Sequence, residues 1–226
     1  MKFTNVIQRI GFFISKEILK TPADVTDAIK TLSDYAFLPS AESDEVEEEH
    51  TLRLELTTKD KRQSVVINGT SINVIRYKMA DDELLNPVQQ HLDTAMGILE
   101  KLKVQFVFNI LNIAIESDYI LDATDEVAKS VYKKLNVEDD VPAAWRFNRL
   151  YKRRADIGEG IDCMEHVSCL RDEIQLVYEE KSTDRIILEF TWGTVIDSEP
   201  SIATISECFT YFVNQINIRI QNYNGI

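Results

Sequence analysis

The chain is poor in the side chains that most often carry out chemistry or bind metals. Its 226 residues include only three histidines and three cysteines, so there are few choices for a general base or a nucleophile. The cysteines (Cys163, Cys169 and Cys208) are odd in number and all lie in the second half of the chain. This is not the pattern of a disulfide framework, so we expect a protein of the reducing cytoplasm.

Long apolar runs are also missing. No stretch approaches the ~20 apolar residues that a membrane-spanning helix needs, so we expect no membrane association. The segment from Met1 to Lys16 carries basic residues and has no continuous apolar region, so we expect mature structure there and not a cleaved signal. Lys and Arg number 25 against 38 for Asp and Glu, and the resulting net charge of -13 repels nucleic acids and anionic membranes at long range.

Catalytic sequence motifs are absent as well. The chain contains no G-x-S-x-G, P-loop or H-E-x-x-H motif, and Gly158-Glu159-Gly160 is an isolated G-x-G that we expect in a loop. Neighbouring carboxylates, such as those of Asp81-Asp82-Glu83, fall at predicted turns and helix starts, where exposure and the helix dipole account for them. The sequence therefore favours a protein without enzymatic activity and predicts no cofactor.

The two halves of the chain are predicted to contain the same secondary-structure elements in the same order. Each half is predicted to form a strand, a capped helix, three strands and an amphipathic helix. We therefore predict a single compact domain over residues 1–226, made of pseudo-repeats 1–102 and 103–226. The predicted fold is α+β: an antiparallel sheet of about eight strands from two β-α-β-β-β-α pseudo-repeats, with helices packed on one face.

Several segments support this prediction. Asn5 to Ser15 is rich in β-branched and aromatic residues, and Thr21 can cap a helix that follows. Leu38 to His50 holds six acidic residues and is predicted to be a solvated loop. Val104 to Ile115 is apolar on both faces and is predicted to be a central strand, with a buried helix as the alternative. Pro200 precedes a last helix with a broad apolar stripe made of Ile202, Ile205, Phe209, Phe212 and Ile216.

The segment Trp145 to Arg154 (WRFNRLYKRR) is basic in an otherwise acidic protein. In one interpretation its aromatic residues pack inward and its cations pair with the surplus carboxylates. In another it docks an acidic partner, such as the 42–49 segment of a second copy. Cations with stacking aromatics also suit single-stranded nucleic acid, although the net charge disfavours that partner. The candidate binding residues are Trp145, Arg146, Arg149, Tyr151, Lys152, Arg153 and Arg154.

A second candidate site comes from a C-x2-H-x2-C pattern. Cys163, His166 and Cys169 have the side chains of a zinc site or a Cys-His nucleophile pair, and Cys208 is a possible fourth ligand. However, paired C-x2-C spacing is missing, and in an extended segment His166 points away from both neighbouring cysteines. We therefore predict no metal site, and a thiol- or zinc-dependent enzyme remains an alternative.

Three segments together carry a resemblance in element order. They are the opening strand NVIQRIGFFIS, the central VQFVFNILNIAI and the closing helix TISECFTYFVNQINIRI. In these the chain resembles uncharacterised bacterial proteins whose architecture is similar to the SecB-like export and antitoxin chaperones. The resemblance implies an oligomeric protein that binds clients or partners and belongs to a stress or antiviral defence operon. The leading hypothesis is a non-enzymatic cytoplasmic interaction module (an adaptor, a chaperone-like protein or a defence component) that binds another protein or its own copies.

Overall fold

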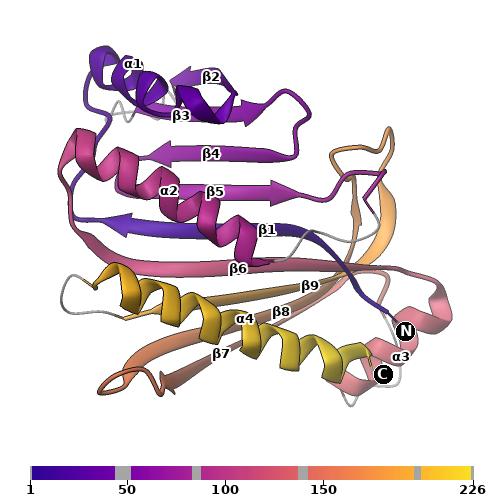
Figure 1. Ribbon diagram of the computed structural model, residues 1–226. Coiled ribbons are helices and arrows are strands. Elements are labelled where there is room, and N and C mark those ends of the chain that lie inside the picture. Colours follow the sequence, from indigo (N-terminus) through magenta and orange to yellow (C-terminus); the bar gives the residue numbers. More distant parts are fainter. Residues whose placement is uncertain (1, 44–51, 83–87, 137–141, 196–199, 225–226) are drawn as a thin grey trace.

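The computed structural model describes residues 2–43, 52–82, 88–136, 142–195 and 200–224. Within these ranges all strands belong to one nine-stranded sheet, in the order β2-β3-β4-β5-β1-β6-β9-β8-β7 (Figure 1). Every neighbouring pair of strands is antiparallel. The protein is therefore α+β, with its first and sixth strands side by side at the middle of the sheet.

The elements follow one another in a simple order along the chain. The first half contains β1 (Thr4–Ile14), α1 (Pro22–Thr31), a 3-10 turn (Ser33–Tyr35), β2 (Phe37–Ser43), β3 (Leu52–Thr58), β4 (Gln63–Asn68), β5 (Ser71–Tyr77) and α2 (Val88–Phe106). The second half contains β6 (Ile110–Asp122), α3 (Asp125–Leu135), β7 (Trp145–Ala155), β8 (Ile161–Ile174), β9 (Thr183–Thr194) and α4 (Ile202–Asn224).

Local sequence signals explain several of these boundaries. Helix α1 begins with a capping box, in which Thr21 Oγ1 accepts a hydrogen bond from the backbone N–H of Asp24 at 3.3 Å and the carboxylate of Asp24 accepts one from the N–H of Thr21 at 2.8 Å. At the start of α3, Thr124 Oγ1 accepts a hydrogen bond from the backbone N–H of Val127 at 3.3 Å. Gly69, in the turn between β4 and β5, has φ of +52°, a conformation that glycine adopts at no steric cost.

Three predicted boundaries are wrong. Phe37–Ser43 is not part of an acidic loop but forms the edge strand β2, which raises the strand count above eight; residues 44–51 lie outside the described ranges. Val104 to Phe106 closes α2, and the strand begins only at Ile110, because an apolar run fits a helix end as well as a strand. The sequence pattern also predicts the first strand of the last hairpin over Ile174 to Tyr178, whereas that strand, β8, ends at Ile174.

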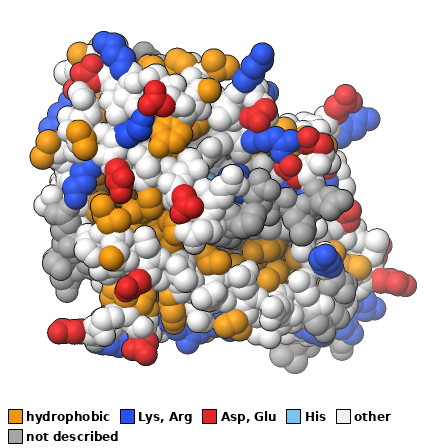
Figure 2. Space-filling view, viewed as in Figure 1, with side chains coloured by type: hydrophobic (Ala, Val, Ile, Leu, Met, Phe, Trp, Pro, Cys, Tyr) orange, Lys and Arg blue, Asp and Glu red, His pale blue; other side chains and the backbone are white. Residues whose placement is uncertain are grey.

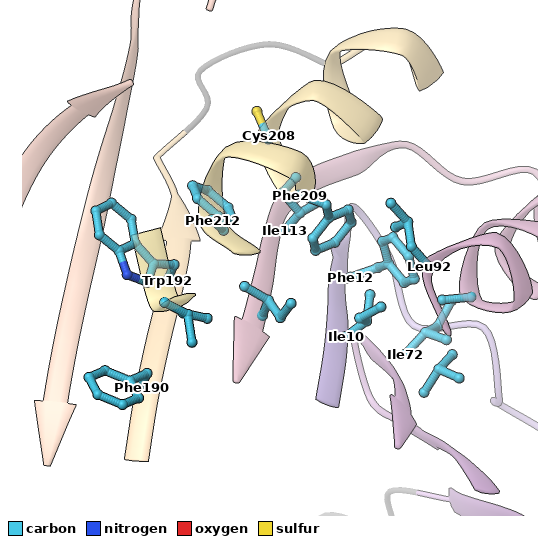
Figure 3. Close-up of a cluster of buried hydrophobic side chains, with 14 of the residues drawn as sticks. Ile10, Phe12, Ile72, Leu92, Ile113, Phe190, Trp192, Cys208, Phe209 and Phe212 are labelled. Carbon is cyan, nitrogen blue, oxygen red and sulfur yellow. The ribbon is translucent and has the colours of Figure 1, made fainter. Parts of the chain in front are cut away.

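The main hydrophobic core lies between the sheet and the helices α2 and α4, which cross the same face (Figure 1). Phe209 of α4 meets Phe12 of β1 edge to face at 5.9 Å, and Phe212 stacks on Trp192 of β9 at 5.7 Å (Figure 3). Burial of each such side chain stabilises the fold by about 2–3 kcal/mol. The stripe predicted on α4 is thus buried against the sheet, except that Ile202 is 53% exposed.

The opposite face of the sheet has no helix of the described chain packed across it. A small apolar cluster lies there where the segment after β8 folds back, and it comprises Val6, Ile120, Leu170, Leu176 and Ile187. Among the described helices, none has both the length and the apolar character to span a membrane.

Candidate functional site at the β7 edge

The basic segment predicted as a candidate site forms β7, an edge strand of the sheet. It pairs with β8 residue for residue, from Trp145 opposite Arg171 to Ala155 opposite Ile161. In the part of the chain that the structure describes, no strand pairs with its other side. The strand therefore presents a regular row of backbone donors and acceptors along eleven residues, which is a template for pairing with another chain.

The aromatic side chains of β7 are turned toward the protein. Trp145, only 8% exposed, and Phe147 pack on Tyr132 of α3, with ring centroids 5.8 Å and 5.6 Å apart. The ring of Tyr151 is covered by the guanidinium group of Arg153 at 4.6 Å. Trp145 is buried and Phe147 and Tyr151 are half-buried, as the interpretation with inward aromatic residues expects.

Three of the five cations on β7 are paired with carboxylates. Arg153 Nε lies 2.8 Å from an oxygen of Glu165. Arg154 and Arg146 make longer and more exposed contacts, at 3.5 Å to Asp162 and 3.6 Å to Glu189. Exposed pairs of this kind contribute at most about 1 kcal/mol, so both ion pairs are weak, although Arg154 also donates a hydrogen bond to the backbone oxygen of Glu159 at 3.0 Å.

Glu165 is the centre of a buried ionic cluster behind the strand. Its carboxylate is fully shielded from solvent and also accepts hydrogen bonds from Arg219 of α4, at 2.7 Å and 3.0 Å. Burial opposes ionisation of this group, but the hydrogen bonds from Arg219 and Arg153 hold the pKa of Glu165 below its ordinary value. The cluster fastens α4 to β8 and to β7, and so fixes the position of the edge strand.

The remaining two cations, Arg149 and Lys152, have no ion pair or hydrogen bond with any described residue, and both are exposed. Leu150 lies between them and is 63% exposed. The middle of the edge strand thus combines free positive charge, an exposed apolar side chain and unpaired backbone groups. This combination is suited to an acidic segment in an extended conformation.

The chain matches no protein-family model. No match to it was found among curated proteins either. The residues of the site are therefore the evidence for its function.

The residues of the C-x2-H-x2-C pattern do not converge. Cys163 and Cys169 face the helices, whereas His166 lies on the other face of β8, because successive strand residues alternate. No group of three or more His, Cys, Asp or Glu residues in the described ranges is arranged to hold a metal ion. Burial raises the pKa of Cys163 and Cys208 to about 11 and that of Cys169 to about 12, so at neutral pH all three are protonated and poor nucleophiles.

A second exposed feature lies between α2 and α4, where Figure 2 shows hydrophobic side chains gathered on the helical face. A hollow of about 310 Å³ is lined there by Leu99, Ile110 and Ile202, among others. Nearby on α2 and just beyond it, Val104 is 84% exposed and Val107 74% exposed. No pattern in the sequence predicted this groove, and nothing in the described chain indicates what would cover it.

Two features of the site were missed by sequence reasoning. Arg219 lies 54 residues from its partner Glu165, and no local pattern links them. A signal did exist for Glu165, because it lies in phase with the buried residues Cys163 and Val167. A charged residue in phase with a buried stripe needs a partner of opposite charge.

Proposed function

We propose that this protein is a non-enzymatic interaction module that binds an acidic, extended segment of another protein along β7. The observation that carries the proposal is the unpaired outer edge of β7, with Arg149 and Lys152 free of ion pairs in the described chain. In such β-augmentation the main chain supplies affinity, and the side chains that flank it supply specificity.

Charge explains why the partner would be acidic and not a second β7. Two β7 strands side by side would oppose five cations with five cations, and like charges on facing strands destabilise pairing. An acidic segment stabilises the pairing instead, because its carboxylates attract the free cations. They also compete with Glu189 and Asp162 for the weakly paired Arg146 and Arg154.

We also infer that the two halves of the chain arose from one duplicated unit, with residues 1–102 and 103–226 as its copies. Outward from the central pair, β1 is followed by β5-β4-β3 and β6 by β9-β8-β7. Each half also has a helix after its first strand and another after its last. Strand β7 then corresponds to β3, whose outer edge is covered by β2. In the first half, β2 therefore pairs with the edge that corresponds to the unpaired edge of β7 in the second half.

The test uses a synthetic peptide with the acidic sequence of residues 40–50, SAESDEVEEEH, added to the full-length protein. We expect binding that weakens as salt is raised. The double variant R149E/K152E is expected to bind at least about tenfold more weakly, since loss of two charge pairs is worth more than about 1.4 kcal/mol. The matched control K16E/K129E changes the net charge equally at exposed sites on other elements.

A second peptide, with alternate backbone nitrogens methylated, keeps the charge but cannot form a strand ladder. Equal binding by the methylated peptide, or by R149E/K152E, would reject the proposal. A single-stranded oligonucleotide that binds more tightly than the peptide would favour the nucleic-acid alternative. Analytical ultracentrifugation tests whether the partner is the acidic segment of a second copy of this chain. In that case the protein would form oligomers, and added peptide would dissociate the oligomers.

A further inference from the structure

A row of polar side chains interrupts the core at the other end of the sheet. Gln63 of β4 lies directly opposite Arg76 of β5, and Arg76 lies directly opposite Gln8 of β1. The three residues are in phase with buried apolar residues of the helix-covered face, such as Val74. Helix α2 crosses this row, and the imidazole of His91 is close enough to Arg76 for the cation to lower the pKa of His91.

These side chains lack the partners that buried polar groups normally have. Arg76 makes no hydrogen bond or ion pair with any described residue, and its Nη2 atom is shielded from solvent. Gln8 is 4% exposed, and its Oε1 atom accepts no hydrogen bond from the described chain. His91 is 1% exposed; backbone groups of Gln8 and Val74 lie near enough to its ring to favour its charged form, but neither ring nitrogen makes a hydrogen bond of good geometry in the described chain. Each such group costs about 1–3 kcal/mol, and of these three Arg76 also lines a pocket, where a ligand could satisfy it.

A pocket of about 170 Å³ opens beside Arg76. Its lining includes Arg62, Gln63, Arg76, Asp82, Gln90 and Thr94.

Arg76 is the cation of the pocket lining that holds no ion pair in the described chain, although Asp82 lies near enough to favour its charge. Asp82 is already bound by Arg62 through both carboxylate oxygens and by the backbone N–H of Met79. Burial, followed by the nearby Arg76, lowers the pKa of His91 to about 4, so at neutral pH its ring is uncharged, with one nitrogen a donor and the other an acceptor. The pocket thus combines one planar cation that has no ion pair, the ion pair of Arg62 with Asp82, and neutral hydrogen-bonding groups.

We propose that this pocket binds a small oxyanion, a carboxylate or a phosphate, on the guanidinium group of Arg76. A guanidinium group matches either oxyanion with two parallel N–H donors. The side-chain amides of Gln63 and Gln90 supply further donors at the wall, and the volume restricts the ligand to a small molecule or a single anionic group. This site is independent of the β7 edge.

The test titrates inorganic phosphate and, separately, succinate into the full-length protein, with chloride at the same ionic strength as the control. Either anion is expected to raise Tm beyond the chloride control and to move the ring resonances of His91. The variant Arg76→Gln removes a cation that has no ion pair. In the absence of added anion, its Tm should therefore equal or exceed that of the wild type. The same variant should weaken anion binding at least about tenfold. Arg9→Gln removes the same charge from the opposite face of β1 and should keep the wild-type response.

A response to phosphate alone or to both anions supports the site and identifies the ligand class. No response beyond chloride, or an equal response in Arg76→Gln, would overturn the proposal. Glu83 lies outside the described residues, so Glu83→Gln is titrated in parallel. Binding that emerges only in Glu83→Gln would mean that the chain's own carboxylate takes the place of the ligand, and this result also overturns the proposal.

Discussion

Asp118 on β6 makes the stability of the protein depend on pH in a way that one substitution can test. Its side chain lies on the face opposite the helices, and its Oδ1 atom is shielded and has no hydrogen-bond partner in the described chain. Burial, with added repulsion from Glu116 and Glu189, raises the pKa of Asp118 from 3.8 to about 7, and Arg9 offsets only part of this.

The sign of the effect follows from proton binding. Between about pH 4 and pH 7 the folded protein holds a proton on Asp118 that the unfolded chain has lost, so the stability contributed by this proton is lost as pH rises through 7. At 1.4 kcal/mol per pH unit, the interval between 3.8 and about 7 corresponds to an upper limit of about 4 kcal/mol. Because the side chain keeps some contact with solvent, we expect about 2 kcal/mol or more.

The variant Asp118→Asn removes the ionisable group and keeps the shape of the side chain. Urea unfolding is measured at pH 5 and pH 8.5 for wild type, Asp118→Asn and the control Asp156→Asn, which changes an exposed residue in the turn after β7. Of the interval between 3.8 and about 7, the assay samples the part above pH 5, so the free energy of unfolding of Asp118→Asn, relative to wild type, should rise by about 1–2 kcal/mol from the lower to the higher pH. A parallel pH dependence of wild type and Asp118→Asn would refute the reasoning, as would the same gain in Asp156→Asn.

Two further predictions follow from buried groups. Glu165→Gln leaves two arginines facing a neutral amide and should lower the free energy of unfolding by about 3 kcal/mol, whereas Asp162→Asn, at an exposed pair, should cost less than about 1 kcal/mol; equal losses in urea unfolding would contradict the buried cluster. The three cysteines should react slowly with a thiol reagent at pH 8 in the folded protein and rapidly in urea, because burial raises their pKa values; fast labelling of the folded protein would show that at least one is accessible.

The sequence predicted local structure correctly where one short segment determines that structure. Thr21 predicted the start of α1, and the dipeptide Asn68-Gly69, a typical tight-turn sequence, lies at the turn between β4 and β5. The basic segment was also recognised as one strand with inward aromatic residues in one of its interpretations. In each case the interacting groups lie within a few residues of one another, so spacing alone fixes their geometry.

The remaining features depend on which strands become neighbours. Alternation predicts the face on which Arg76 lies, but not that Gln8 and His91 meet it from elements far away in the sequence. Nor does it reveal that β7 lies at an edge, since that depends on the strand order of the whole sheet. The strand β2 was not predicted because an acidic run begins within it and continues beyond its end. Charged residues are tolerated on an edge strand.

Hydrogen–deuterium exchange along β7, with and without the acidic peptide of residues 40–50, tests the proposed docking edge most directly. Pairing of the peptide with β7 predicts slower exchange of alternate amides between Trp145 and Ala155, and no such slowing in R149E/K152E. Bound peptide that leaves these amides unchanged, and protects residues elsewhere, would contradict the assignment of β7 as the docking edge.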